Sequence, residues 1–186
     1  MKRVFIIHCW GGTPKDNWYS WLKAQLEKEG FAVEVPAMPD TEHPRRETWV
    51  PLLKKRIGKP DKDTYLVGHS IGCSAILRYL EENGPVGGCL LVAGFFEVTW
   101  PHVPTKEDKA LMDGWTGPLD EGAVRKNAGD LRCLFSDNDP WVPLSNVKKF
   151  EERLGAKAVV ERKQGHYSNG MATVPTALKM LLEMAR

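Results

Sequence analysis

The pentapeptide Gly68-His69-Ser70-Ile71-Gly72 carries the most specific chemical signal in this chain. It is a Gly-x-Ser-x-Gly pattern between the apolar run 64–67 and a stretch with helical periodicity. A tight strand-to-helix turn strains the backbone of its serine and leaves no space for side chains on either side. The two glycines meet this requirement because they have no side chain. Such a turn presents the serine hydroxyl at a helix N-terminus, where backbone N–H groups and the helix dipole stabilise developing negative charge. Ser70 is therefore the candidate nucleophile.

A serine nucleophile needs a general base and an acid that orients the base. In proteins with this type of serine turn, the chain order is serine, then the acid, then a histidine that acts as the base. His166 lies in the loop after the last predicted strand and is the expected base. His8 is expected to bond loop backbone at a strand end, and His69 to pack beneath the serine turn. Two further histidines are expected to be exposed in loops: His43 and His102.

The acid that orients the base has two candidates in the segment 135–143, Asp137 and Asp139. Asp139 precedes Pro140, which favours an extended backbone that projects the carboxylate from the loop. Asp137 directly follows the predicted strand, where an aspartate commonly closes an Asx-turn on its own backbone. Asp139 is the preferred acid, and Asp137 is the alternative.

The remaining requirement is a pair of backbone N–H groups that bind a developing oxyanion. In turns of this type one N–H belongs to the residue after the nucleophile, here Ile71, and the other comes from a loop after an early strand. The segment His8-Cys9-Trp10-Gly11-Gly12 is that loop. Trp10 is the expected donor, because the glycines after it let the backbone approach a bound acyl group closely.

Short apolar and β-branched runs alternate along the chain with stretches of helical periodicity. Six strands are predicted at 4–8, 32–35, 64–68, 88–93, 131–135 and 157–161. Five helices are predicted near 18–29, 47–56, 71–82, 143–154 and 173–185. This alternation predicts an α/β fold, a mostly parallel six-stranded sheet between two layers of helices. Ligands of such sheets bind beyond the carboxyl ends of the strands, where the loops described above lie.

Residues 1–186 are expected to form a single domain, since 42% hydrophobic residues suffice for one well-buried core. The irregular stretch 95–129 is predicted to be a small cap-like insert with a short helix around 106–112. The aromatic residues expected to line a substrate pocket beside Trp10 are Phe95, Phe96, Trp100, Trp115 and Trp141. A partly roofed apolar pocket favours short acyl esters over long-chain lipids.

The charge balance argues against a protein that binds nucleic acid through bulk electrostatics. The chain has 26 Lys and Arg against 24 Asp and Glu, a formal net charge of +2, and these charges are scattered. No apolar run approaches the ~18 residues of a membrane span. Lys2-Arg3 is followed only by the apolar run 4–7, which is too short for a signal-peptide core. A cytoplasmic protein without a membrane partner is expected.

The four cysteines, Cys9, Cys73, Cys89 and Cys133, stand far apart and form no Cys-x-x-Cys pair. This spacing fits neither a zinc site nor a thioredoxin-like redox centre. The cysteines are expected to be small apolar residues in a reduced compartment, with Cys9 beside the candidate site. Neither a metal nor a cofactor is predicted.

The sequence resembles the small serine hydrolases related to retinoblastoma-binding protein nine and bacterial YdeN, nearly from end to end. The segments that carry this resemblance are 8–12, Asn17-Trp18, Trp21-Leu22, Met38-Pro39, 66–73, Ala93-Gly94-Phe95, 139–143 and Gly165-His166.

That family is a compact α/β-hydrolase group, so the resemblance implies a triad of Ser70, Asp139 and His166. It also implies that the first two strands of larger α/β hydrolases are missing, and that the sheet starts at the strand before the oxyanion loop. Cys9 stands where larger α/β hydrolases more often have glycine. The human member's name refers to binding through a Leu-x-Cys-x-Glu segment, which this chain lacks. Retinoblastoma protein is therefore not an expected partner.

Together these residues predict a serine hydrolase that cleaves small ester or amide substrates through an acyl-enzyme. One alternative is a binding protein that keeps the fold without turnover. Another is an enzyme that uses the same residues for acyl transfer or for carbon–carbon bond cleavage. The complete set of nucleophile, acid, base and oxyanion loop favours an enzyme over a binding protein.

Overall fold

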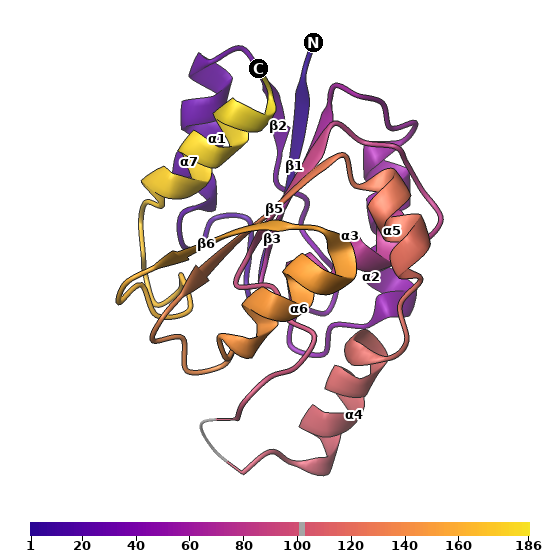
Figure 1. Ribbon diagram of the computed structural model, residues 1–186, viewed down its shortest axis with the longest axis vertical. Coiled ribbons are helices and arrows are strands. Elements are labelled where there is room, and N and C mark those ends of the chain that lie inside the picture. The colour runs from indigo at the N-terminus through magenta and orange to yellow at the C-terminus, as the bar shows by residue number, and fades with distance from the viewer. Residues whose placement is uncertain (101–102) are drawn as a thin grey trace.

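The computed structural model describes residues 1–100 and 103–186 (Figure 1). His102, which was expected to be an exposed loop residue, lies outside the described residues.

All six predicted strands are present, and they form one sheet in which every neighbouring pair is parallel. The strands are β1 (Arg3–Ile7), β2 (Ala32–Glu34), β3 (Thr64–His69), β4 (Gly88–Val92), β5 (Asp130–Ser136) and β6 (Lys157–Glu161). β3 and β4 are buried along their whole length, as strands covered on both faces must be. The predicted six-stranded sheet is confirmed, and it is entirely parallel.

Seven helices lie within the described residues. They are α1 (Tyr19–Lys28), α2 (Arg46–Ile57), α3 (Ile71–Leu80), α4 (Lys106–Thr116), α5 (Glu121–Asn127), α6 (Ser145–Leu154) and α7 (Pro175–Met184). Five of them coincide closely with the predicted helices, and α4 extends beyond its expected range. α5 was not predicted. It is short, and its start is marked by Asp120, whose carboxylate accepts a hydrogen bond from the Ala123 N–H.

The helices cover both faces of the sheet (Figure 1). α1 and α7 pack against one face and against each other, while α2, α3, α5 and α6 lie on the other side. Every residue of α3 is buried, because this helix lies between β3 and its helical neighbours α2, α4 and α5. The predicted arrangement of a sheet between two helical layers is confirmed.

The strand order is β2-β1-β3-β4-β5-β6, so the direction in which strands are added reverses at β1 and β3. These two strands are direct neighbours, with Ile7 opposite Gly68 in the parallel register. The carboxyl ends at such a reversal form a crevice in which open α/β sheets bind ligands. The loop after β1 and the turn at Ser70 therefore leave the sheet side by side.

The segment 95–129, which was predicted to be a small cap-like insert, contains α4 and α5. α4 lies at the end of the molecule opposite the two chain termini (Figure 1). Arg78 of α3 holds the C-terminal end of α4. Its guanidinium donates to the carbonyls of Trp115 (3.0 Å), Gly117 (2.6 Å) and Pro118 (2.5 Å). A cation at this position also interacts favourably with the helix dipole.

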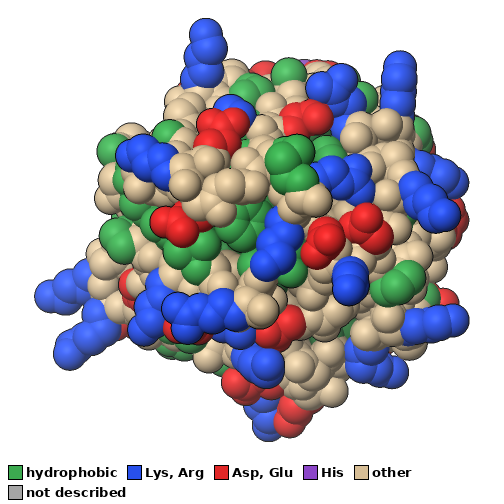
Figure 2. Space-filling view, turned by 90° about the horizontal axis from the view of Figure 1, so that it is seen from above, with side chains coloured by type: hydrophobic (Ala, Val, Ile, Leu, Met, Phe, Trp, Pro, Cys, Tyr) green, Lys and Arg blue, Asp and Glu red, His purple; other side chains and the backbone are tan. Residues whose placement is uncertain are grey.

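Charged side chains of both signs are interspersed on the face drawn in Figure 2, with apolar side chains between them. In the described part of the chain, the helices are all too short or too polar to cross a lipid bilayer.

Candidate active site

Ser70 occupies the tight turn between β3 and α3. Its backbone dihedrals are φ 55° and ψ −120°, a conformation that costs a residue with a side chain about 1–3 kcal/mol. Two hydrogen bonds hold it: the Ser70 N–H donates to the Val92 carbonyl (2.9 Å), and the Cys73 N–H donates to the Ser70 carbonyl (2.9 Å). The side chain is thus fixed at the N-terminus of α3.

Gly68 and Gly72 are required by close backbone contacts on either side of the serine. A Cβ atom on Gly68 would lie 2.7 Å from the Cys73 nitrogen, and one on Gly72 would lie 2.3 Å from the Ile7 carbonyl oxygen. Real side chains do not tolerate such distances, so either substitution would displace α3. Because Gly72 lies so close to the Ile7 backbone, the start of α3 packs directly against the end of β1.

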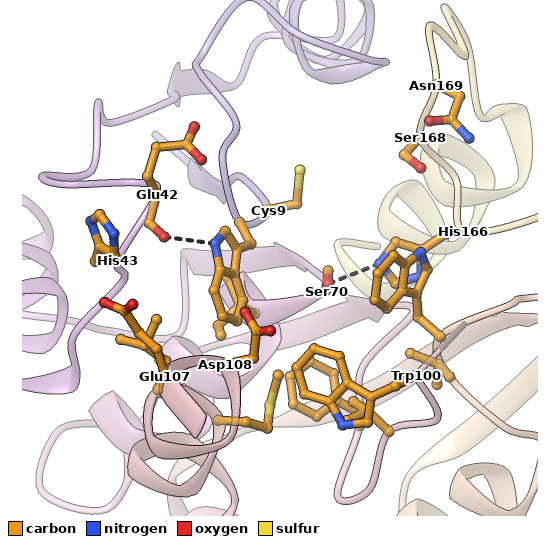
Figure 3. Close-up of a pocket in the computed structure, with 18 residues that line it drawn as sticks. Cys9, Glu42, His43, Ser70, Trp100, Glu107, Asp108, His166, Ser168 and Asn169 are labelled. Atoms are coloured by element: carbon orange, nitrogen blue, oxygen red, sulfur yellow. Dashed lines mark hydrogen bonds between the residues drawn. The ribbon is translucent and has the colours of Figure 1, made fainter. Parts of the chain in front are cut away.

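The imidazole of His166 lies between Ser70 and Asp139. Its Nε2 atom is 2.9 Å from the Ser70 Oγ, a contact drawn in Figure 3, and its Nδ1 atom is 2.7 Å from the Asp139 Oδ2. An ionised carboxylate only accepts hydrogen bonds, so Nδ1 carries the proton and the Nε2 lone pair faces the hydroxyl. The Asp139 side chain is only 2% exposed and that of His166 only 12%. Three predicted residues thus form one series of hydrogen bonds.

The two candidate acids have different partners. Asp139 uses Oδ2 for His166, while its Oδ1 accepts the N–H groups of Trp141 (2.9 Å) and Val142 (3.0 Å). The turn within the loop is therefore closed by Asp139 itself. Asp137 was expected to close a turn on its own backbone, but its Oδ1 accepts the Lys163 N–H (2.7 Å). The structure brings Asp139, and not Asp137, to His166.

The backbone next to His166 is anchored by Tyr167, which is completely buried. The Tyr167 hydroxyl donates to the Phe135 carbonyl at the end of β5 (2.7 Å), and the Trp18 indole N–H donates to the Tyr167 carbonyl (3.0 Å). These bonds fix the loop that carries His166 to the sheet and to the start of α1. No pattern in the sequence had assigned Tyr167 this role.

The loop after β1 is held by hydrogen bonds to the backbone N–H and to the backbone carbonyl of Cys9. The Cys9 N–H donates to the Tyr19 hydroxyl (3.1 Å), and the Cys9 carbonyl accepts from the His8 Nδ1 (3.0 Å) and from the Gly12 N–H (3.1 Å). The C=O and N–H of a trans peptide point in opposite directions. The Trp10 N–H therefore points away from His8 and Gly12.

The neighbours of the Trp10 N–H are engaged elsewhere. The Gly11 N–H donates to the Thr41 carbonyl (2.8 Å). The Trp10 indole N–H donates to the Glu42 carbonyl (2.9 Å), a bond drawn as the dashed line at Glu42 in Figure 3. Ile71 is the first residue of α3, where a backbone N–H has no acceptor within the helix. The N–H groups of Trp10 and Ile71 thus remain the expected oxyanion donors.

A cavity of about 560 Å³ opens at Ser70 and His166. Its apolar lining consists of Trp10, Ile71, Phe95, Val98, Trp100, Leu111, Met112, Trp141 and Val142. The rings of Trp100 and Trp141 pack edge to face, with centroids 6.2 Å apart. Three of the five aromatic residues predicted for this pocket, Phe95, Trp100 and Trp141, therefore line it.

The other two, Phe96 and Trp115, do not line this cavity, and the prediction was wrong for them. Phe96 follows Phe95 in a loop, but its side chain packs against Phe150. The centroids of these two rings are 4.6 Å apart. Trp115 is 3% exposed, packs against Trp49 and donates its indole N–H to the Pro44 carbonyl (2.9 Å). It fixes the C-terminal turn of α4, one turn beyond the cavity.

The sequence profile described as serine hydrolase matches residues 4–182 of the chain. The chain belongs to the serine hydrolase family. Its relatives include YdeN of Bacillus subtilis (strain 168), 31% identical over 186 residues, which cover 97% of this chain and 94% of YdeN. Serine hydrolase RBBP9 of Rattus norvegicus is 26% identical over 170 residues, which cover 90% of this chain and 88% of RBBP9.

Solved structures place this family member in the α/β-hydrolase superfamily. The crystal structure of B. subtilis YdeN has a TM-score of 0.88 and 30% identity, covering 99% of this chain and 98% of YdeN. Est1E from Butyrivibrio proteoclasticus with bound ferulic acid has a TM-score of 0.75 at 14% identity, covering 99% of this chain and 89% of Est1E. The similarity to Est1E shows a shared fold alone. The predicted family and α/β-hydrolase fold are confirmed.

The cavity of this serine hydrolase family member also has a polar lining that no sequence pattern predicted. It consists of Cys9, Glu42, His43, Glu107, Asp108, Ser168 and Asn169. In the view of Figure 3, Glu42 and Glu107 lie across from Ser168 and Asn169, with Ser70 between them. Neither Lys nor Arg is among the described residues that line the cavity. Glu107 and Asp108 reach it only because α4 packs against α3, which their positions in the sequence do not indicate.

The described residues contain no group of three or more His, Cys, Asp or Glu side chains that is placed to hold a metal ion. Cys73, Cys89 and Cys133 are buried free thiols, and Cys9 is half-buried beside the cavity. Burial raises the pKa of the Cys9 thiol.

Two buried histidines lie beneath the site, and both are neutral at ordinary pH. His8 accepts the Met38 N–H at Nε2 (3.1 Å), so its Nδ1 carries the proton that it donates to the loop backbone, as expected. Burial lowers the pKa of His8. Burial, with a smaller effect of the nearby His166, lowers the pKa of His69 to about 3. His69 packs beneath the serine turn, as expected, against Trp18 and Tyr19.

These histidines predict a loss of stability in mild acid. The pKa of His69 is about 3 in the folded protein against an ordinary value of 6.5, so between these pH values the unfolded chain binds a proton that the folded protein does not. The free energy of unfolding therefore decreases as the pH falls below 6.5. The contribution of His69 between pH 7 and pH 5 is about 2 kcal/mol, and that of His8 has the same sign.

Urea unfolding at pH 7 and pH 5 measures this effect, and the His69→Gln variant isolates it. The variant should lose less stability than the wild type over the same interval, because glutamine does not titrate. An identical loss in both proteins would show that His69 does not remain neutral in the folded state.

Proposed function

We propose that this protein hydrolyses small ester or amide substrates with Ser70 as the nucleophile, His166 as the general base and Asp139 as the orienting acid. The observation that carries the proposal is the series of contacts from Ser70 Oγ to His166 Nε2 and from His166 Nδ1 to Asp139 Oδ2. The strained backbone of Ser70 supports it, because strain of this kind concentrates at functional sites.

In the first half-reaction, the Ser70 Oγ attacks the carbonyl carbon of the substrate while His166 Nε2 takes the hydroxyl proton. Asp139 holds the imidazole in the tautomer with a free Nε2 lone pair and stabilises the imidazolium that forms. The negative charge on the substrate oxygen is stabilised by the N–H groups of Trp10 and Ile71. His166 then gives its proton to the leaving alcohol or amine, and an acyl-enzyme ester remains on Ser70.

In the second half-reaction, a water molecule replaces the leaving group. His166 takes a proton from this water as its oxygen attacks the acyl carbon, and the same N–H groups stabilise the second oxyanion. Collapse of the intermediate breaks the bond to Ser70, and the proton held on His166 returns to Oγ. The products are a carboxylic acid and the restored enzyme.

The cavity indicates the class of acyl group. Its apolar wall includes Phe95, Trp100 and Trp141, and its volume of about 560 Å³ is that of a small-molecule site. The carboxylates of Glu42 and Glu107 contribute negative charge that no lining Lys or Arg in the described chain offsets. A neutral acyl group is therefore favoured over an anionic one. The fold neighbour Est1E binds ferulic acid, which makes a small aromatic acyl group a further one to test.

We expect turnover of p-nitrophenyl esters to rise with acyl length and to peak at about six carbons. Each methylene buried against the apolar wall contributes about 0.8 kcal/mol, or about fourfold in kcat/KM, until the cavity is full. The measurement is kcat/KM for the series from acetate to palmitate. A maximum at palmitate, or activation by a lipid interface, would contradict the proposed substrate class.

Two matched substrates test the charge of the cavity within the same series. The butyrate and the succinate monoester differ by a terminal carboxylate, and the succinate should be the poorer substrate because of Glu42 and Glu107. Equal kcat/KM values for the two esters would show that these carboxylates do not face the bound acyl group.

A further inference from the structure

A buried series of hydrogen bonds connects the oxyanion loop with the loop that carries the base. It runs from the Cys9 N–H to the Tyr19 hydroxyl (3.1 Å), from Tyr19 to His69 Nδ1 (2.6 Å), and from His69 Nε2 to the His166 carbonyl (2.7 Å). The side chains of Tyr19 and His69 do not line the cavity. Their connection therefore lies behind the proposed catalytic groups rather than among them.

The direction of each hydrogen bond follows from the chemistry of its partners. A carbonyl only accepts, so the Nε2 atom of His69 carries the proton that it donates to the His166 carbonyl. The ring is neutral, so its Nδ1 atom has a lone pair and accepts the Tyr19 proton. The Tyr19 oxygen then accepts from the Cys9 N–H and from the Asn17 side-chain amide (3.5 Å). One tautomer satisfies every group in the series.

Each end of the series fixes backbone next to a group with a proposed catalytic role. At one end, the Cys9 N–H is held by Tyr19, and the Cys9 carbonyl belongs to the same peptide unit as the Trp10 N–H. At the other end, the carbonyl of His166 is held, and this residue carries the proposed base. His69 itself directly precedes Ser70 in the chain. The series thus touches the backbone of the nucleophile, the base and the oxyanion loop.

These hydrogen bonds are costly to lose because the groups that form them are buried. Tyr19 and His69 are both completely buried, so water cannot easily replace a missing partner. Removal of the Tyr19 hydroxyl would leave the Cys9 N–H and the His69 Nδ1 unpaired, which the protein can relieve only by moving backbone. The Cys9 N–H lies in the peptide unit that precedes the one containing the Trp10 N–H, and the two units are joined at the Cys9 Cα. A shift of the first unit therefore displaces the second.

We propose that Tyr19 and His69 are positioning residues, which hold the Trp10 N–H and the His166 imidazole in register with Ser70. The proposal rests on the proposed hydrolase function. Loss of the connection should weaken stabilisation of the transition state more than binding of the substrate, because the cavity wall is left intact.

The Tyr19→Phe variant tests the oxyanion end of the series. It keeps the buried ring and removes only the hydroxyl, so kcat should fall by about tenfold or more while KM changes by less than about twofold. A trifluoromethyl ketone, which forms a tetrahedral adduct with the serine, should lose affinity by the same factor as kcat/KM. A merely structural tyrosine would alter the unfolding midpoint without this separation of kcat from KM.

Two substitutions of His69 test the other end. Glutamine places an amide N–H near the position of Nε2 and keeps a donor for the His166 carbonyl, whereas leucine removes both hydrogen bonds. Activity should therefore fall further in His69→Leu than in His69→Gln. Equal kcat values in the two variants would show that the bond to His166 has no positioning role.

Tyr79→Phe is the matched control. Within the described chain, the Tyr79 hydroxyl is buried without a hydrogen-bond partner, so its removal should leave kcat and ketone affinity within about twofold of the wild type. The proposal is overturned if Tyr19→Phe behaves in the same way. It is also overturned if imidazole ¹⁵N shifts at pH 7 show the proton of His69 on Nδ1, a result that does not depend on activity.

The failure of the proposed function has a separate signature. A wild-type protein that neither hydrolyses esters nor reacts with a fluorophosphonate would refute the hydrolase itself. An active and reactive wild type with an unaffected Tyr19→Phe variant would refute only the positioning role.

Discussion

Replacement of Ser70 by alanine is expected to lower kcat for ester hydrolysis by about 10⁴-fold or more. Alanine cannot form an acyl-enzyme, so only the catalysis supplied by the oxyanion donors and by substrate binding remains. The substitution removes a single oxygen from a turn that is held by its backbone bonds to Val92 and Cys73. The fold should therefore persist, and circular dichroism with the unfolding midpoint can verify this.

Ser74→Ala is a suitable control, because Ser74 is a buried serine one turn further along α3. It should change kcat by less than about twofold. Wild-type turnover in Ser70→Ala would exclude Ser70 as the nucleophile, and a large loss in Ser74→Ala alone would show that turnover depends on Ser74 instead.

Asp139→Asn is expected to lower kcat by about 10³ to 10⁴-fold. The Trp141 and Val142 N–H groups hold Oδ1 of this side chain, so the amide of an asparagine would turn its NH₂ group toward His166. His166 would then have to accept at Nδ1 and carry its proton on Nε2, where it faces Ser70. A base in this tautomer cannot take the serine proton.

Asp137→Asn provides the comparison. Its Oδ1 bonds the Lys163 N–H, and its side chain is 36% exposed, so the variant should lose some stability and retain turnover. If the two substitutions exchange these effects on kcat, Asp137 is the acid and the loop adopts a different arrangement during catalysis.

The fold was predictable because its signals are local. Apolar runs such as 64–67 and 88–92 have no alternation, which is typical of parallel strands covered on both faces. The serine turn was predictable for the same reason, since the clash of a Cβ at Gly68 with Cys73 is a contact within a few residues along the chain. The order of nucleophile, acid and base then narrowed the search for the other two residues.

The pocket was less predictable because its residues meet only through tertiary packing. Phe95 and Phe96 are adjacent in the chain, yet one lines the cavity and the other packs against Phe150. A loop with no periodicity does not indicate which side chain turns inward. The same holds for Trp115, whose direction is decided by its contacts with Trp49 and Pro44.

The connection through Tyr19 and His69 was also beyond sequence patterns. Tyr19 is separated from His69 by 50 residues, and neither spacing nor composition links the two. His69 could be assigned to packing beneath the turn, but its hydrogen bonds depend on where α1 places the Tyr19 hydroxyl. Long-range polar contacts of this kind become visible only when the elements are assembled.

The most direct test of a nucleophilic Ser70 is covalent labelling with a fluorophosphonate. Only an activated hydroxyl attacks the phosphorus at a useful rate and displaces fluoride. Intact mass should show one adduct on the wild-type protein, peptide mapping should place it on Ser70, and Ser70→Ala should remain unlabelled. No adduct under conditions in which a control esterase reacts, or an adduct on Ser74 or Ser168, would contradict this account.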